Sequence, residues 1–120
     1  MGILRSSVKK AAEIAGFKRS DISKIILAVD EACTNIIKYA YRGDNTKIIR
    51  IKIIPIESGI KFIISDDGKK PDLKKIKARK LDDVRPGGLG VHFISEIMDC
   101  VRYKPGKEKG TKLTLIKYVP

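Results

Sequence analysis

The first forty residues carry apolar side chains at intervals of three and four, which is the period of an α-helix. This period predicts one amphipathic helix from Ile3 to Ala15, ended by Gly16. A second helix is expected to begin near Ser20 or Asp21, either of which can cap it, and to run to about Tyr41. The predicted core stripe of the second helix is Ile22, Ile25, Ile26, Val29, Cys33, Ile36 and Ala40.

The period changes to two after residue 48, which is typical of β-strands. The stretch "KIIRIKIIP" alternates isoleucines with Arg50 and Lys52 and predicts a strand with one solvent-facing side that ends at Pro55. The turn "ESG" and the apolar run 60–65 that follows it predict a hairpin. A helix is expected over about 89–99, and strands are expected in "CVRYK" and "TKLTLIKYV", with a turn at "PGKEKG" between them.

These elements occur in the order ααββαββ, without an internal repeat or a domain linker. The helices and the sheet can bury each other, so the predicted fold class is α+β, a two-layer sandwich. At 120 residues, of which 42% are hydrophobic, the chain fits a single domain, 1–120, that folds without a structural metal or disulfide. Residues 69–86 carry many charges and little periodicity, and connections of that length are often functional.

The two cysteines, Cys33 and Cys100, lie far apart and lack the spacing of a metal site. We interpret both as reduced core residues of a cytoplasmic protein. The first residues lack the apolar segment of a secretion signal, and no stretch is long and apolar enough to cross a membrane. The sequence therefore predicts a soluble protein with no membrane partner.

The formal charge of +12 suits nucleic acid, an anionic membrane surface, or a nucleotide together with an acidic protein partner. The lysines are scattered along the chain. Four tyrosines, three phenylalanines and no tryptophan offer few surfaces on which bases could stack. We expect no direct contact with nucleic acid, and a basic nucleic-acid module is kept as a lesser alternative.

Glu31 and Asn35 stand four residues apart in the second predicted helix and share one face, roughly opposite the core stripe. The amide oxygen of Asn35 is a hard ligand of the kind that Mg²⁺ prefers. The carboxylate of Glu31 can accept a proton from a hydroxyl group or from water. An ordinary solvated face of an amphipathic helix is the alternative interpretation.

Two further segments are candidates for binding a nucleotide. Asp66 follows an apolar strand and precedes Gly68, where the backbone can turn sharply, and its carboxylate can accept a hydrogen bond from an amine such as that of adenine. The glycine-rich run 87–90 leads into a helix whose N–H groups can bind phosphate, and Arg85 can add a charged contact. The run matches neither the P-loop nor the dinucleotide-binding pattern, and ordinary turns are the alternative for both segments.

Four short motifs, taken in order, resemble the four boxes of the Bergerat-fold ATPases, the superfamily of gyrase, MutL, heat-shock chaperone and histidine-kinase ATP domains. They are Glu31-x-x-x-Asn35, Asp66-x-Gly68, Gly88-Leu89-Gly90 and Gly110-Thr111. Within this superfamily, "EACTNIIKYAY" and "GGLGVHFISEIMDCVRY" are most similar to the anti-sigma factor serine/threonine kinases of bacteria. The resemblance covers the chain from about residue 10 to the end.

The resemblance implies a role for each matching position. Glu31 would be the general base, Asn35 the Mg²⁺ ligand and Asp66 the acceptor for the amine of adenine. The remaining roles would be the turn beneath the base for Gly68, phosphate contacts for Arg85, Gly88, Leu89 and Gly90, and support of the adenine end for Thr111. Residues 69–86 would be the ATP lid.

The implied function is that of an anti-sigma factor with ATP-dependent serine protein kinase activity. It would hold a sigma factor inactive and transfer the γ-phosphoryl group of Mg·ATP to a serine of an anti-anti-sigma protein of the STAS type. One alternative is a histidine-kinase-type ATP-binding domain, although such domains more often carry asparagine at the position of Glu31. Another is a non-catalytic module in which ATP gates protein binding. The single histidine, His92, is interpreted as a packing or capping residue.

The chain departs from the family pattern in two places. Lys70 and Pro71 stand where the family often has a second glycine. The chain also begins almost directly in its first helix, where the family usually has a strand. An edge of the sheet could then be covered by another chain, which leaves the oligomeric state open and allows a homodimer.

Overall fold

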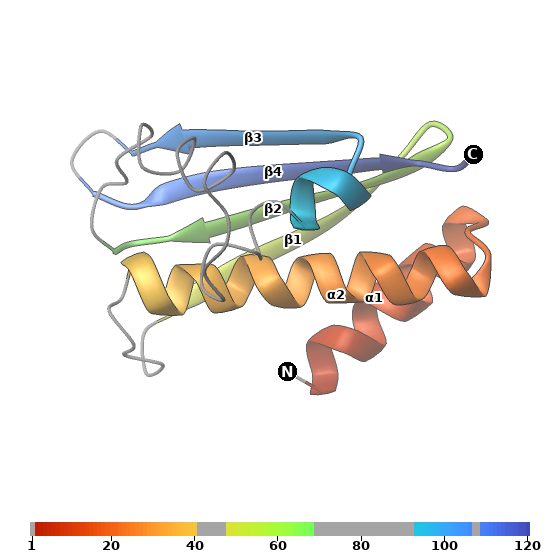
Figure 1. Cartoon of the computed structure of the whole chain (residues 1–120), viewed down its shortest axis with the longest axis horizontal. Coiled ribbons are helices and arrows are strands. Elements are labelled where there is room, and N and C mark those ends of the chain that lie inside the picture. The colour runs from red at the N-terminus through yellow and green to blue at the C-terminus, as the bar shows by residue number, and fades with distance from the viewer. Residues whose placement is uncertain (1, 41–47, 69–92, 107–108) are drawn as a thin grey trace.

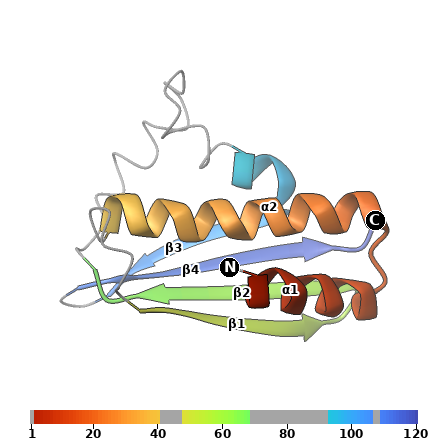
Figure 2. The same ribbon diagram turned by 90° about the horizontal axis from the view of Figure 1, so that it is seen from below.

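The computed structural model describes residues 2–40, 48–68, 93–106 and 109–120. Within these ranges, helices lie on one face of a four-stranded sheet, as Figures 1 and 2 show from two sides. The predicted fold class, an α+β two-layer sandwich, is confirmed. The predicted order of elements is confirmed as well, because residues 93–97 are helical between the second and third strands.

Helix α1 (Gly2–Ala15) ends where the sequence predicts. Gly16 follows it with a φ of 98°, a left-handed conformation that glycine adopts without a steric penalty. The N–H of Phe17 donates to the carbonyl oxygen of Ala12 at 3.1 Å and closes the helix end. The Phe17 side chain is buried, so the turn between the two helices is held by packing as well as by hydrogen bonds.

Helix α2 (Arg19–Asn35) begins earlier than the sequence predicts. Its N-cap residue is Lys18, which makes no side-chain cap hydrogen bond, so the prediction that Ser20 or Asp21 caps the helix is wrong. Asp21 lies instead in the first turn, where a negative charge interacts favourably with the helix dipole. The start of the helix therefore depends on the packed turn that precedes it rather than on a polar cap.

The prediction of one regular helix reaching Tyr41 is only partly correct. The α-helix stops at Asn35 and continues as the π-helix η1 (Ile36–Ala40), and Tyr41 lies outside the described residues. The N–H of Ile36, at the boundary between the two helices, donates to the carbonyl oxygens of both Ala32 and Cys33. Short π-helical turns occur frequently at functional sites, and this one directly follows a candidate site residue.

The sheet contains strands β1 (Ile49–Ile56), β2 (Gly59–Asp66), β3 (Cys100–Pro105) and β4 (Thr111–Tyr118). All neighbouring strands are antiparallel, and their order across the sheet is β1-β2-β4-β3, so β1 and β3 are the edges. The predicted hairpin is the β1–β2 pair, and Ser58 in its turn has a φ of 57°. The last two predicted strands are confirmed as β3 and β4.

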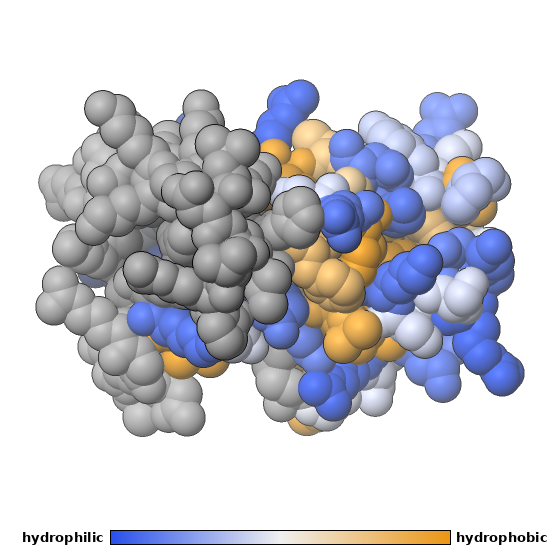
Figure 3. Space-filling model, in the orientation of Figure 1, coloured by the Kyte–Doolittle hydropathy of each residue, from blue (hydrophilic) through white to orange (hydrophobic). Residues whose placement is uncertain are grey.

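The core lies between the inner face of the sheet and the two long helices. Ile60, Phe62 and Ile64 project from β2 and are 0 to 1% exposed. Side chains of this size contribute roughly 1.5–3 kcal/mol each when they are fully buried, so this strand anchors the sandwich. Figure 3 shows that hydrophobic side chains also gather near the middle of the face crossed by α2, bordered by hydrophilic ones. Leu27 on α2 is 51% exposed.

The cysteine prediction is correct for one residue and wrong for the other. Cys33 is buried in α2, and burial raises the pKa of its thiol to about 11. Cys100 is only half-buried and occupies the outward side of β3, opposite Ile116. Strand alternation places Cys100 on the face of the sheet away from the helices, and therefore outside the core.

Candidate functional site

Three candidate side chains come from elements that meet at one end of the molecule. The C-terminal part of α2, the end of β2 and the start of β4 all lie on the left in Figures 1 and 2. Asn35 closes α2, Asp66 closes β2 and Thr111 opens β4. Asp66 and Thr111 are direct partners in the register of the sheet.

Asp66 is the one charged residue in the buried set of the described chain, at 4% exposure. It continues the inward-facing series of Ile60, Phe62 and Ile64, so alternation along β2 carries a carboxyl group into the same layer as the core. The N–H of Gly68 donates to Oδ1 of Asp66 at 2.9 Å. Oδ2 is buried and has no hydrogen-bond partner among the described residues.

Burial is the main cause that raises the pKa of Asp66 above its ordinary value. The hydrogen bond from the N–H of Gly68 and the charge of Arg50 oppose that shift in the pKa, while the neighbouring charge of Asp67 adds to it. A buried carboxyl oxygen without a partner is costly in the free protein. Oδ2 is an acceptor without a donor among the described residues, and an amine could supply that donor.

A close approach of backbone fixes the position of Asp66. The N–H of Gly110 donates to the carbonyl oxygen of Gly68 at 2.7 Å. Gly110 has a φ of 79°, and a Cβ atom added there would overlap the backbone carbonyl oxygen of Asp66. Glycine at position 110 is therefore required both by its backbone conformation and by the space available. The close contact between these two backbone segments explains why the Gly110-Thr111 motif carries a glycine where it meets the Asp66-x-Gly68 motif.

Glu31 and Asn35 are both half-buried on α2, one turn apart. This differs from the solvated face that was the alternative interpretation. Nδ2 of Asn35 is buried and has no hydrogen-bond partner in the part of the chain that the structure describes. Ala28 and Ala32 are fully buried and extend the buried side of α2 towards Asn35. The carboxamide is thus largely removed from water and able to bind another group.

The other candidate residues lie outside the described residues. They are Arg85, Gly88, Leu89, Gly90 and His92, together with the predicted lid 69–86 and the departures Lys70 and Pro71. The predicted helix over 89–99 is described only in part, as the helical residues 93–97. Within that part, Ser95 has a buried hydroxyl without a hydrogen-bond partner among the described residues, which the sequence analysis did not single out.

The described residues do not by themselves supply a full set of ligands for a magnesium ion. Among them, no group of three or more His, Cys, Asp or Glu side chains could hold a metal. The available groups are the carboxylate of Glu31 and the amide of Asn35, which are hard oxygen ligands. This set suits Mg²⁺, which usually keeps several waters and shares its ligands with substrate phosphates.

An open hollow of about 650 Å³ lies elsewhere, between the start of α1 and the inner side of β1. Its lining is almost entirely apolar and includes Ile3, Leu4, Ile51 and Ile53. None of the candidate residues lines it, and it offers no titratable side chain. No helix within the described ranges combines the length and the apolar character needed to cross a membrane.

Comparisons with known proteins agree with this arrangement. The family model described as a histidine kinase-like ATPase domain matches residues 1–117. The serine-protein kinase RsbW of Staphylococcus aureus, in strains JH9 and Newman, is 33% identical to the chain over 128 residues. The match covers 99% of this chain and 79% of the relative.

Two solved structures share the fold. The histidine kinase domain from the blue-light activated histidine kinase EL346 of Erythrobacter litoralis superimposes with a TM-score of 0.64 at 14% identity. A structure of the EL346 histidine kinase itself gives a TM-score of 0.65 at 16% identity. The chain is covered to 97% and 98%, and it spans 61% and 40% of those two chains. At this identity the likeness concerns the fold alone.

Proposed function

We propose that this chain, which belongs to the histidine kinase-like ATPase domain family, is an anti-sigma factor kinase. The proposal is supported by the bacterial serine-protein kinases that match nearly the whole length of the chain. It binds Mg·ATP in a single domain, 1–120, transfers the γ-phosphoryl group to a serine of an anti-anti-sigma protein of the STAS type, and holds a sigma factor inactive. The observation that carries the proposal is the buried Oδ2 of Asp66, an unpartnered acceptor among the described residues.

In this proposal Asp66 binds the adenine base. Its Oδ1 is occupied by the N–H of Gly68, so Oδ2 remains to accept a hydrogen bond from the exocyclic amine. A hydrogen bond that involves a charged group contributes about 1.5–3 kcal/mol. Gly68, two residues past the end of β2, and Thr111, at the start of β4, flank this carboxyl and support the adenine end of the site.

Glu31 acts as the general base and Asn35 holds the metal. The γ-phosphorus forms a bond to the serine oxygen and breaks its bond to the oxygen that leaves with ADP, while Glu31 takes the serine proton. Asn35 would hold Mg²⁺ through its amide oxygen, and the bound ion would offset phosphate charge. The half-buried setting of both side chains limits competition from water and favours a single geometry.

The phosphates are proposed to contact Arg85, Gly88, Gly90 and the N–H of Leu89, beneath a lid formed by residues 69–86. This part of the proposal rests on the motif and on the charge of Arg85. The chain is proposed to work in the cytoplasm, and a homodimer through an open sheet edge is consistent with β1 and β3 as edge strands.

A phosphoryl-transfer assay tests the proposal. The purified chain is incubated with Mg²⁺, with ATP radiolabelled at the γ-phosphate, and with a candidate STAS-type protein. Serine labelling is expected for the wild type and is expected to fall at least about a hundredfold for Glu31→Gln, since general base catalysis contributes about 10²–10⁴-fold. ATP binding should persist in that variant.

The control for this assay is Glu13→Gln, which removes the same charge from an exposed position on α1. It should transfer phosphate at the wild-type rate. Labelling that survives Glu31→Gln would refute the assignment of the base. Binding of ATP without any transfer by the wild type would favour the non-catalytic, ATP-gated module, and absence of ATP binding would refute the larger proposal.

A further inference from the structure

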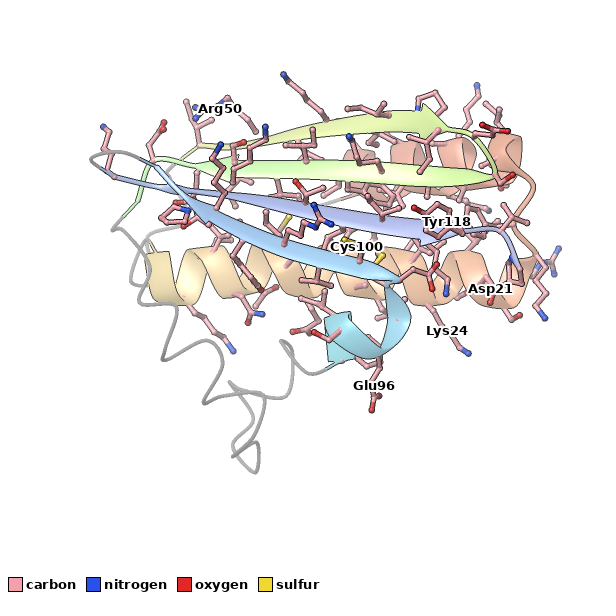
Figure 4. All side chains as sticks on the ribbon, turned by 90° about the horizontal axis from the view of Figure 1, so that it is seen from above. Asp21, Lys24, Arg50, Glu96, Cys100 and Tyr118 are labelled. Atoms are coloured by element: carbon pink, nitrogen blue, oxygen red, sulfur yellow. The ribbon has the colours of Figure 1, made fainter. Side chains whose placement is uncertain are left out.

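On the face of the sheet away from the helices, most cations lie toward one end and most apolar side chains lie toward the other. Figure 4 looks onto this face, and among the described residues no helix covers it. Arg50 lies at the left end in that view, and Tyr118 and Cys100 lie further to the right. Outward positions follow from the strand alternation and the register.

We define the basic strip as the four exposed cations that the register places in the half of this face that contains Arg50. They are Lys52 on β1, Arg102 and Lys104 on β3, and Lys112 on β4. None of the four has an ion-pair partner within the described ranges. Arg50 adjoins the strip and is held by Asp67 through two hydrogen bonds of 3.0 and 2.9 Å.

The strip contains a contact that works against folding. Lys104 and Lys112 are direct partners in the β3–β4 register. Like charges directly opposite each other on antiparallel strands destabilise the sheet. No outward-facing position on the four strands carries Asp or Glu, so no strand residue of this face offsets the charge of the four cations in the strip. An anionic partner would relieve the repulsion.

The apolar end of the same face consists of Ile54, Ile56, Ile116 and Tyr118 around the half-buried Lys61, and Ile63 lies beside Lys52 at the border with the basic strip. Tyr118 is 49% exposed, and the four isoleucines are half-buried. A nucleic acid would use the cations but would gain little from isoleucine side chains, because its phosphate backbone supplies most of the affinity. A second copy of the chain would bring its own cations to the strip, so charge opposes self-association there.

We propose that this outer face of the sheet docks a protein partner that presents an acidic segment beside an apolar one, the acidic segment on the basic strip and the apolar segment on the isoleucines. Apolar contact supplies the affinity, and charge complementarity supplies orientation and a fast association rate. The surface lies on the side of the sheet opposite to the inward-facing Asp66, so it does not depend on the proposed phosphoryl transfer.

The test measures binding of a fluorescein-labelled peptide, a run of glutamates joined to a leucine–serine repeat, by fluorescence anisotropy at low salt and without ATP. The same peptide with glutamine in place of glutamate is the reference. Lys104→Glu should weaken binding of the acidic peptide about tenfold, because it both removes a cation and adds an anion within the strip. High salt should reduce the difference.

Lys9→Glu is the matched control, since it makes the same charge change at an exposed position of α1, and it should alter binding less than about twofold. Lys104→Glu should also raise the melting temperature, because it converts a like-charge pair with Lys112 into an opposite-charge pair. The loss of binding then cannot be attributed to unfolding.

Equal binding by Lys104→Glu and the wild type would overturn the proposal. So would an equal loss in Lys9→Glu, which would indicate attraction to net charge alone. Tighter binding of a short DNA duplex than of the acidic peptide, with the same dependence on Lys104, would assign the face to nucleic acid instead. Concentration-dependent dimerisation that Lys104→Glu strengthens would assign it to a second copy of the chain.

Discussion

Replacement of Asp66 by asparagine separates recognition of adenine from the stability of the fold. In the wild type the nitrogen of Gly68 lies 2.9 Å from Oδ1 of Asp66. Asparagine keeps the shape of the side chain and an oxygen that can accept the same hydrogen bond. It places an NH₂ group where Oδ2 lies, so a donor would face the amine of adenine. The lost charged hydrogen bond amounts to about 1.5–3 kcal/mol, or roughly a tenfold to hundredfold loss of ATP affinity.

The free protein should respond differently from the complex. Desolvation raises the pKa of Asp66, which means that folding disfavours the charged form at neutral pH. A buried charge without a partner costs more than a buried neutral amide, and Oδ2 has no partner among the described residues. The melting temperature of Asp66→Asn without nucleotide should therefore equal or exceed that of the wild type.

Asp67→Asn is the control, because it removes the same charge one residue further along the chain. Asp67 is exposed, and its hydrogen bonds with Arg50 lower the pKa of its carboxyl. The interaction that lowers this pKa stabilises the folded state at pH values above the ordinary pKa of 3.8. That stabilisation is lost as the pH falls through the pKa of the folded state. At pH 7 Asp67→Asn should lower the melting temperature slightly and leave ATP affinity within about twofold.

Isothermal titration calorimetry with ATP and thermal unfolding of the free protein provide the two measurements. Unchanged ATP affinity in Asp66→Asn would refute adenine recognition by this carboxyl. A fall in melting temperature that accompanies the loss of affinity would refute the argument about the buried charge, because the site would then be lost by misfolding.

Two further predictions concern stability and reactivity. Gly110→Ala should lower the unfolding free energy by about 1–3 kcal/mol in urea titrations, because the φ of 79° and the facing carbonyl oxygen leave no place for a Cβ. The control is Gly2→Ala, where a Cβ would meet nothing within 4 Å, and it should not lower the unfolding free energy. Cys33, 2% exposed with its thiol pKa raised to about 11, should resist alkylation by iodoacetamide at pH 7.5 while Cys100 reacts. Equal loss of stability in both glycine variants, or rapid alkylation of Cys33 mapped by mass spectrometry, would contradict these arguments.

Hydrophobic periodicity predicted every long element. The period reflects which side chains pack into the core, and this packing decides where the elements form. The boundaries followed local effects that periodicity does not contain. Helix α2 starts at Arg19 since Gly16 and the buried Phe17 fix the turn before it. Asp21 satisfies the sequence rule for a cap and yet sits inside the helix. Packing of the connection outweighed a capping contribution of about 1 kcal/mol.

The candidate site was predictable in part from the same periods. Alternation along β2 puts Asp66 on the side of Ile64, so its burial follows from the sequence once the strand is accepted. The buried amide of Asn35 was missed, because the expected core stripe omitted Ala28 and Ala32, whose small side chains carry little weight in a hydrophobic pattern. Their complete burial turns that side of α2 towards the interior.

The basic strip shows what the sequence could not contain. The four cations are scattered along the chain, at Lys52, Arg102, Lys104 and Lys112. Their spacing and the formal charge of +12 therefore did not indicate which kind of partner the protein binds. The antiparallel register places Lys104 opposite Lys112, and the strand order brings Lys52 onto the same face. A one-residue slip in any strand would move its cations to the helix side. The partner chemistry proposed for this face therefore depends on register, and a register change would abolish it while leaving composition and net charge unchanged.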